Sequence, residues 1–205
     1  MNVYVESNFV LEHALQQEES HSCAEIIRLA SDGQIALVVP AFSLAEPHQA
    51  ISGKAKVRSR LGEDLRRQLG ELARSKPHRE IPATFDVLAA ALIERAQFER
   101  DGLRRAVSEF LSTAEIIPLD AGVLRSAADI EATFGLSGQD AIVLASVFYH
   151  LEANRPDDSC FLNRNSRDFD DPDIRDRLEA LRCKFFPNFT PALAYVASRL
   201  RFKTG

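Results

Sequence analysis

The sequence has few of the residues and patterns that mark several large protein classes. Its three cysteines, Cys23, Cys160 and Cys183, are widely spaced and form no C-x-x-C pair. This argues against a disulfide framework or a zinc knuckle and favours a reducing cytoplasm. No stretch approaches the roughly 20 uninterrupted apolar residues of a membrane helix, and no basic lead followed by an apolar run marks a signal peptide. We therefore expect a cytoplasmic protein without a membrane partner.

Histidine motifs and an excess of basic charge are also missing. The five histidines form neither H-x-H nor H-E-x-x-H, so carboxylates would have to hold any bound metal, which favours Mg²⁺ or Mn²⁺. The formal net charge of −5 does not suggest a protein that coats nucleic acid through bulk charge. It is compatible with a nuclease, because an acidic metal site adds negative charge while local basic segments contact phosphates.

The apolar runs that are present indicate alternating strands and helices in one domain, residues 1–205. The expected strands cover residues 3–5, 35–39, 115–117, 160–162 and 184–186, with helical patterns between them. This alternation predicts an α/β fold with a mostly parallel sheet of about five strands flanked by helices. A long helical pattern from Phe42 to Leu111, broken near Lys76-Pro77 and Ile81-Pro82, predicts a helical insertion or arm at about residues 52–112.

Helix-end signals are clear at several positions. Ser22 and Glu25 fit a capping box, and Gly33 lies where a C-terminal cap belongs. Asp120 can cap a helix that stops before Gly135. The next helix begins near Ser137, and its apolar positions, Ala141, Leu144, Ala145, Phe148 and Leu151, fall on one stripe.

Four acidic residues follow expected strands. Glu6 comes directly after the first, Glu46 lies in the first turns after the second, Asp140 opens the Ser137 helix and Asp168 lies in the loop after residues 160–162. The carboxyl ends of parallel strands form the functional crevice of such a sheet. Clustered carboxylates repel one another, and cations neutralise them. Two divalent ions about 4 Å apart can activate a water and stabilise a phosphodiester transition state.

Each of these residues also has a simpler interpretation. Ser137 with Asp140, and Ser43 with Glu46, are spaced as capping boxes. Glu6 could be a strand-end surface residue and Asp168 a turn residue. It is the joint placement of all four that favours a metal site.

The four segments resemble the PIN domain family. Residues 3–8 (VYVESN) look like its opening strand and acidic-Ser/Thr-Asn signature, and residues 39–46 (VPAFSLAE) like its second segment. Residues 136–145 (LSGQDAIVLA) are the best match, resembling the segment in which an Asp opens a helix. Residues 161–169 (FLNRNSRDF) are similar to the fourth segment, a strand followed by Thr-Arg-Asn/Asp and Asp-Phe. The resemblance covers residue 3 to about residue 186.

This resemblance implies a metal-dependent ribonuclease that uses Mg²⁺ or Mn²⁺, often the toxin of a toxin–antitoxin pair. By position, Glu6, Glu46, Asp140 and Asp168 become metal ligands, directly or through water. Ser7, Asn8 and Asn165 become supporting polar groups.

The sequence departs from the family pattern at three positions. Glu6 stands where Asp is usual, Asn163 where Thr is usual, and Asn165 where many members have Asp. These departures motivate an alternative, a PIN-like binding or scaffold protein that has lost catalysis. Another carboxylate-metal hydrolase, such as a phosphatase, is disfavoured because Glu6-Ser7-Asn8 supplies no nucleophilic Asp after the first strand.

Basic residues on the helical insertion are candidate RNA contacts. Lys54 pairs with Arg58, and Lys56 with Arg60, at i,i+4 spacing. They could hold RNA phosphates, as could Arg164 in the fourth segment, although charged runs are usually only solvated helix faces. The resemblance further implies RNA as substrate, with an antitoxin protein and a homodimer as possible partners. The insertion would then be a clamp, a dimer surface or an antitoxin-binding arm.

Overall fold

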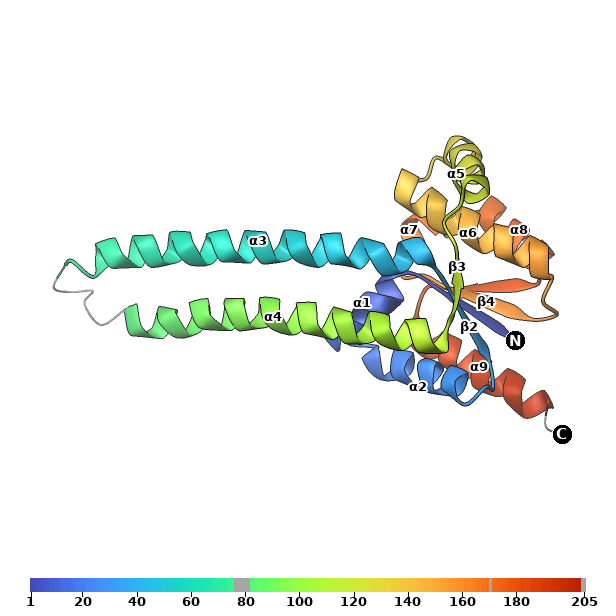
Figure 1. The fold of residues 1–205 in the computed structure, drawn as a ribbon, viewed down its shortest axis with the longest axis horizontal. Coiled ribbons are helices and arrows are strands. Elements are labelled where there is room, and N and C mark those ends of the chain that lie inside the picture. Colours follow the sequence, from blue (N-terminus) through green and yellow to red (C-terminus); the bar gives the residue numbers. More distant parts are fainter. Residues whose placement is uncertain (76–81, 170, 204–205) are drawn as a thin grey trace.

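The fold is built on a five-stranded parallel sheet, as seen in a computed structural model that describes residues 1–75, 82–169 and 171–203 (Figure 1). The strands are β1 (Asn2–Val5), β2 (Ala36–Pro40), β3 (Glu115–Ile117), β4 (Ser159–Leu162) and β5 (Cys183–Phe186). Their order is β3-β2-β1-β4-β5, and every neighbouring pair is parallel. The predicted α/β class is therefore confirmed, and β1 lies at the centre of the sheet.

Helices connect the strands and cover both faces of the sheet. They are α1 (Ser7–Leu15), α2 (Ser20–Ser31), α3 (Ala41–Leu72), α4 (Pro82–Thr113), α5 (Ala121–Phe134), α6 (Gly138–Asn154), α7 (Ser166–Phe169), α8 (Pro172–Ala180) and α9 (Phe189–Lys203). None of them, within the described ranges, has the length and apolar character needed to cross a bilayer.

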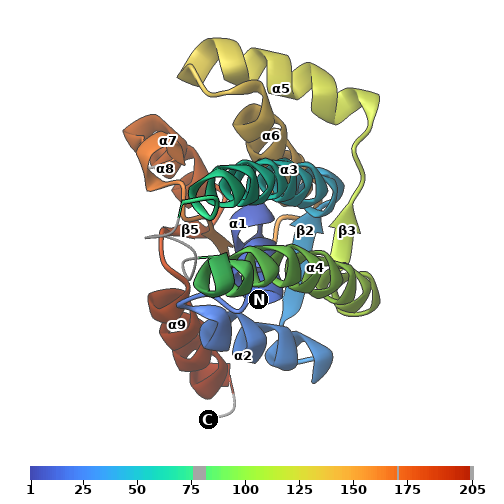
Figure 2. The ribbon, with the colours of Figure 1, turned by 90° about the vertical axis from the view of Figure 1, so that its left-hand side faces the viewer.

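Side-chain alternation along the strands divides the core into two layers. Val3 and Val5 of β1 pack with residues of α1, α2, α4 and α9, whereas Tyr4 packs with residues of α5, α6 and α8. Figure 2 shows α5 to α8 on one side of the sheet and α2 and α9 on the other. Because successive strand side chains point to opposite faces, a run that is apolar at every position fits a sheet covered on both sides.

Helices α3 and α4 form a long arm. They lie side by side in antiparallel directions and extend well beyond the sheet (Figures 1 and 2). Within the arm, Glu99 is 2% exposed and accepts hydrogen bonds from Arg58 of α3 and Arg95 of α4. This buried pairing holds the two helices in register, since removing one partner would leave an uncompensated charge. The helix break predicted near Lys76-Pro77 and Ile81 lies outside the described residues; α3 ends at Leu72 and α4 begins at Pro82.

The capping box predicted at Ser22 and Glu25 is wrong. Helix α2 begins earlier, at Ser20, so Ser22 lies inside it. The Ser22 hydroxyl shares a 2.8 Å hydrogen bond with the Thr190 hydroxyl, and Glu25 pairs with Arg28 on the helix surface. The S-x-x-E spacing is thus used here for tertiary contact and helix-face pairing.

The other predicted helix ends are confirmed. Gly33 has φ +69° just after α2, the left-handed conformation that glycine adopts at helix ends. Asp120 Oδ1 accepts hydrogen bonds from the backbone N–H groups of Gly122 and Val123. Ser137 is the N-cap of α6, and its Oγ accepts from the Asp140 N–H.

A glycine allows α4 to pack closely against α1. A Cβ on Gly102 would lie 2.3 Å from the backbone oxygen of Ala14. Alanine is intrinsically better than glycine in a helix by about 1 kcal/mol, but a backbone oxygen cannot move aside as a flexible side chain can. We expect Gly102→Ala to lower the free energy of unfolding by ~2 kcal/mol, measured by urea denaturation.

The matched control is Gly70→Ala, in α3, where an added Cβ would meet nothing within 4 Å. This variant should be stabilised by about 0.5–1 kcal/mol through its better helix propensity. Equal effects of the two substitutions would contradict the close approach of α4 to α1.

Candidate metal centre

An acidic cavity lies at the carboxyl end of the central strand. Its volume is about 520 Å³, and Glu6, Glu46 and Asp140 are among its lining residues. Glu6 follows β1. From β1 the chain builds β2 and β3 on one side of this strand and then β4 and β5 on its other side, so the cavity lies at the point where the strand order reverses. Open α/β sheets bind ligands at such a position. The structure therefore brings together three of the four predicted acidic residues.

Glu6 is the most buried of these carboxylates. It is the N-cap of α1, 5% exposed, and its Oε2 accepts a 2.9 Å hydrogen bond from the Asn8 backbone N–H. Its Oε1 is buried and has no hydrogen-bond partner among the described residues. Burial raises the pKa of Glu6 to about 8, the Asn8 N–H opposes this shift, and the nearby Glu46 and Asp140 raise the pKa further.

Glu46 lies in the second turn of α3 and accepts a short hydrogen bond from the Ser7 hydroxyl. The Ser43–Glu46 capping box is wrong, because α3 begins at Ala41 directly after β2 and its N-cap is Pro40. Ser43 is buried within the helix, and its Oγ has no partner among the described residues. Glu46 therefore has no capping role, and the Ser7 hydroxyl holds its carboxylate at the cavity.

Asp140 serves both as part of a helix cap and as a wall of the cavity. Its Oδ2 accepts a 2.6 Å hydrogen bond from the Ser137 hydroxyl, which in turn accepts from the Asp140 N–H at 3.2 Å. Its Oδ1 accepts from the Asn165 Nδ2 at 3.4 Å. The two roles are compatible, since the first turn of α6 points at the cavity.

Asn165 lies in the cavity wall, whereas Asp168 lies beside it. The Asn165 amide group donates to Asp168 Oδ2 at 2.8 Å as well as to Asp140, so it bridges the two carboxylates. Asp168 is exposed and, among the described residues, is not one that lines the cavity. It was expected in a loop, but it lies in the short helix α7, which begins at Ser166.

Two buried side chains near the site were not singled out from the sequence as part of it. Asn163 is 2% exposed, and its Oδ1 accepts from the Asn165 N–H at 2.8 Å, which fixes the turn after β4. Glu12 is 1% exposed and accepts from Arg164 at 2.5 Å. The sequence marks Asn163 only as a departure from the usual Thr, and nothing in the helical pattern around Glu12 indicates burial.

The predicted RNA contacts fall into different environments. Arg164 lines the acidic cavity, and Lys54 lines a smaller cavity beside it. Arg58 is engaged with Glu99 inside the arm. Lys56 and Arg60 are exposed on α3 and line neither of these two cavities within the described part of the chain.

The donor set of the acidic cavity suits a hard divalent cation. It offers the carboxylates of Glu6, Glu46 and Asp140, the ligand type that Mg²⁺ and Mn²⁺ prefer. The unpartnered Oε1 of Glu6 is an oxygen for which a cation would compensate. In the ranges that the structure describes, no three acidic, histidine or cysteine side chains form a ready-made metal cage. The cavity residues therefore fit a cation by their chemistry.

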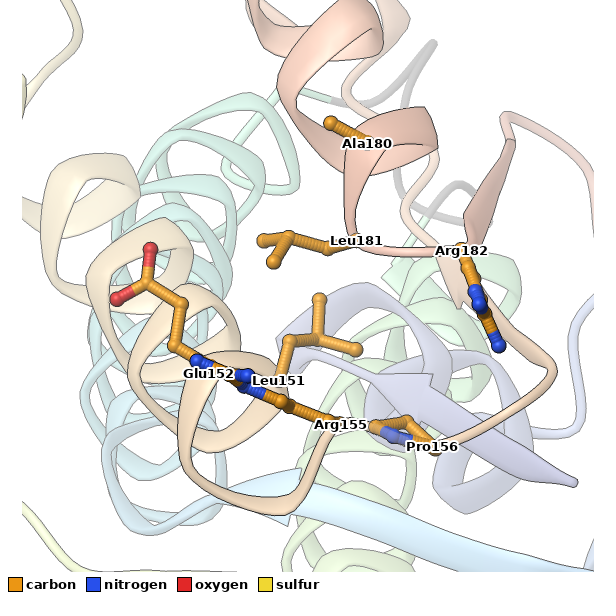
Figure 3. Close-up of a pocket in the computed structure, with 7 residues that line it drawn as sticks. All are labelled: Leu151, Glu152, Arg155, Pro156, Ala180, Leu181 and Arg182. Atoms are coloured by element: carbon orange, nitrogen blue, oxygen red, sulfur yellow. The ribbon is translucent and has the colours of Figure 1, made fainter.

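A second cavity, of about 390 Å³, has a different character (Figure 3). Its side chains come from the end of α6 and from the segment between α8 and β5, at the amino ends of the strands. Leu151 and Leu181 line it together with Arg155 and Arg182, and its carboxylate, Glu152, pairs with Arg177. It offers no cluster of oxygen ligands, so the acidic cavity is the better metal site.

The buried Glu6 makes the stability of the metal-free protein depend on pH. Its pKa of about 8 in the folded protein exceeds the ordinary value of 4.5. Between these values the folded protein keeps a proton that the unfolded chain releases, so stability falls as pH rises through this window. In Glu6→Gln this contribution is absent, because an amide does not ionise.

The measurement is thermal or urea denaturation in chelator between pH 5 and pH 9. We expect wild type to lose more stability than Glu6→Gln, by about 1.4 kcal/mol for each pH unit between the unfolded and the folded pKa of Glu6. The control Glu63→Gln alters an exposed carboxylate of the arm and should follow wild type. Parallel curves for wild type and Glu6→Gln would show that Glu6 is ionised and well solvated.

Comparison with known proteins places the chain in a family. No curated protein matches it, but the family model described as PIN domain matches residues 3–169. The matched stretch includes all four predicted acidic residues and both helices of the arm, and it confirms the resemblance seen in the four motifs. Because the match covers well over half of the sequence, this chain belongs to the PIN domain family.

Proposed function

We propose that this protein is a divalent-metal-dependent endoribonuclease that hydrolyses RNA phosphodiester bonds at the acidic cavity. PIN domains are generally nucleases that act on RNA and use divalent metals. The observation that carries the proposal is the convergence of Glu6, Glu46 and Asp140, from three distant segments, on one cavity. We take residues 1–205 as a single PIN-like domain in which about 52–112 form the arm.

The residues have distinct roles in this proposal. Glu6, Glu46 and Asp140 would hold Mg²⁺ or Mn²⁺, and Asp168 would act from the rim, directly or through water. Ser7 orients Glu46, the Asn8 N–H orients Glu6, and Asn165 orients Asp140 and Asp168. When bound, the cation supplies an activated water and neutralises the charge that develops on the phosphate.

Glu6 makes cation binding depend on proton release. With a pKa of about 8, its carboxyl keeps a proton near neutral pH in the absence of a cation. A cation needs the deprotonated ligand, so binding expels this proton. The buried Oε1, which has no hydrogen-bond partner among the described residues, would then gain a partner.

The alternative is a PIN-like binding or scaffold protein without catalysis. Two residues motivate it. Glu6 carries one methylene more than the usual Asp, and Asn165 puts a neutral amide where many members have a carboxylate. In this structure the amide bridges Asp140 and Asp168, a contact that a third carboxylate could not make without a proton.

Cleavage of a panel of structured RNAs with Mn²⁺ decides between these functions. We expect wild type to cleave and Asp140→Asn to lose at least ~100-fold in rate, since the amide weakens cation binding. Asp129→Asn, on the exposed face of α5, is the matched control and should retain wild-type activity. Equal cleavage by wild type and Asp140→Asn would refute the site. Absence of both cleavage and calorimetric Mn²⁺ binding in wild type would establish the scaffold function.

We further propose that the protein is a cytoplasmic toxin of a toxin–antitoxin pair, with the arm as its contact surface for an antitoxin or a second copy. The three cysteines are buried free thiols, as expected in a reducing compartment. On the arm, Val57 and Leu61 of α3 and Val87, Leu88 and Ile93 of α4 are each more than half exposed. Such apolar groups on one projecting element are typical of interaction surfaces.

Light scattering coupled to size-exclusion chromatography tests the arm. If it is a homodimer surface, we expect the mass of a dimer for wild type and of a monomer for Leu61→Glu. Leu124→Glu, at an exposed apolar position on α5, should leave the dimer intact. A monomeric wild type would exclude the homodimer.

A toxin role also predicts a small reading frame directly upstream of the gene, and its absence would count against that role.

A further inference from the structure

The acidic cavity adjoins a smaller cavity that is lined by two basic side chains. This smaller cavity, of about 170 Å³, shares Asn8, Leu11 and Arg164 with the acidic cavity and adds Lys54 from α3. Two positively charged side chains, Lys54 and Arg164, therefore lie beside the candidate metal ligands. This arrangement is what an enzyme acting on a polyanionic strand needs next to its reactive centre.

The helical spacing of α3 places Lys54 above Glu46. Glu46, Ala50 and Lys54 are separated by four residues each, so they follow one face of the helix. Ala50, between them, also lines the acidic cavity and has a small side chain. Lys54 is exposed, so its charge is available to a ligand.

The other cations of this segment do not meet this condition. Arg58 continues the same face but is paired with the buried Glu99 of α4. Lys56 is turned by about 200° around the helix from Lys54, and Arg60 by the same angle from Arg58. Of the four basic residues expected on this helix, only Lys54 thus joins the cavity.

Arg164 is held in place by a buried carboxylate, Glu12. Its guanidinium donates to Glu12 Oε2 at 2.5 Å, while Glu12 Oε1 accepts from the Glu19 N–H. Glu12 is 1% exposed, but the Arg164 side chain remains 38% exposed. A guanidinium has five N–H donors, so one side can bind the buried carboxylate while the other faces the cavities. The buried carboxylate fixes its position and lowers the entropy lost when it binds an anion.

We propose that Lys54 and Arg164 form a subsite for a phosphate of the RNA strand adjacent to the scissile one. This inference rests on the proposed nuclease function and specifies how that site holds its substrate. The acidic cavity, with the metal ion that its carboxylates would hold, would take the reacting phosphate, and Lys54 and Arg164 would bind the neighbouring phosphate. The strand therefore runs from the carboxyl end of β1 along the base of the arm.

The test measures RNA binding in the Asp140→Asn background, so that cleavage does not interfere. A fluorescein-labelled single-stranded RNA is titrated with protein and followed by anisotropy at several salt concentrations. We expect Lys54→Ala to raise the Kd at least 5-fold. We also expect it to reduce the slope of log Kd against log salt by about 0.7, the value for one lost contact with a single strand. Lys56→Ala, two residues away on the opposite face, is the matched control and should change the Kd less than 2-fold.

Arg164 needs a gentler substitution, because its loss would leave Glu12 buried without a partner. Arg164→Lys keeps the charge and loses the fork of donors, so we expect weaker binding with an unchanged melting temperature. In the catalytically intact protein, Lys54→Ala should raise KM while kcat changes little, since the contact is made equally in the ground and transition states.

The outcomes separate the subsite from the nuclease function. Equal effects of Lys54→Ala and Lys56→Ala, with wild type still cleaving RNA, would overturn the subsite and leave the nuclease intact. Weaker binding by Lys54→Ala alone, without cleavage by wild type, would support the subsite in an RNA-binding protein that is not a nuclease. Absence of RNA binding in the parent would overturn the subsite itself.

Discussion

A carboxylate buried at the end of the central strand is the constraint around which this site is organised. Glu6 is enclosed by the fold, near two other acidic side chains, and one of its oxygens has no protein partner among the described residues. Such a group costs free energy through desolvation and like-charge repulsion. The fold tolerates it because the Asn8 N–H binds one oxygen, and because burial raises the pKa of the carboxyl and so favours its neutral form. A cation would relieve both costs. The burial of Glu6 is therefore stronger support for a metal site than its negative charge alone.

The neighbouring polar groups show how the remaining carboxylates are kept in place. Ser7 holds Glu46, Ser137 holds Asp140, and Asn165 bridges Asp140 and Asp168. Asn163 supports this bridge from the buried side of the turn. The acidic groups are thus positioned mostly by neutral donors, which fix orientation without cancelling the negative potential that attracts a cation.

The arm and the site share one helix. Helix α3 carries Glu46 in its second turn and Lys54 two turns further along, and beyond them it packs against α4 around Glu99. The arm is therefore a continuation of the cavity wall. Gly102 and the contact of α4 with α1 connect the second helix of the arm to the body of the protein. In the proposed function, RNA binding and any contact made by the arm would accordingly act on the same helix.

The strands, most helix ends and the family followed from local sequence, because apolar periodicity, caps and short motifs are properties of neighbouring residues. The S-x-x-E pattern failed at Ser22 and Ser43, since the start of each helix is set by the preceding chain and not by the pattern alone. Tertiary structure decided which charges share an environment. It separated Lys54 from Arg58, buried Glu12 and Glu99, and placed Asn165 in the wall and Asp168 beside it. Burial and distance between segments more than a hundred residues apart depend on the packed fold, so no local pattern could reveal them.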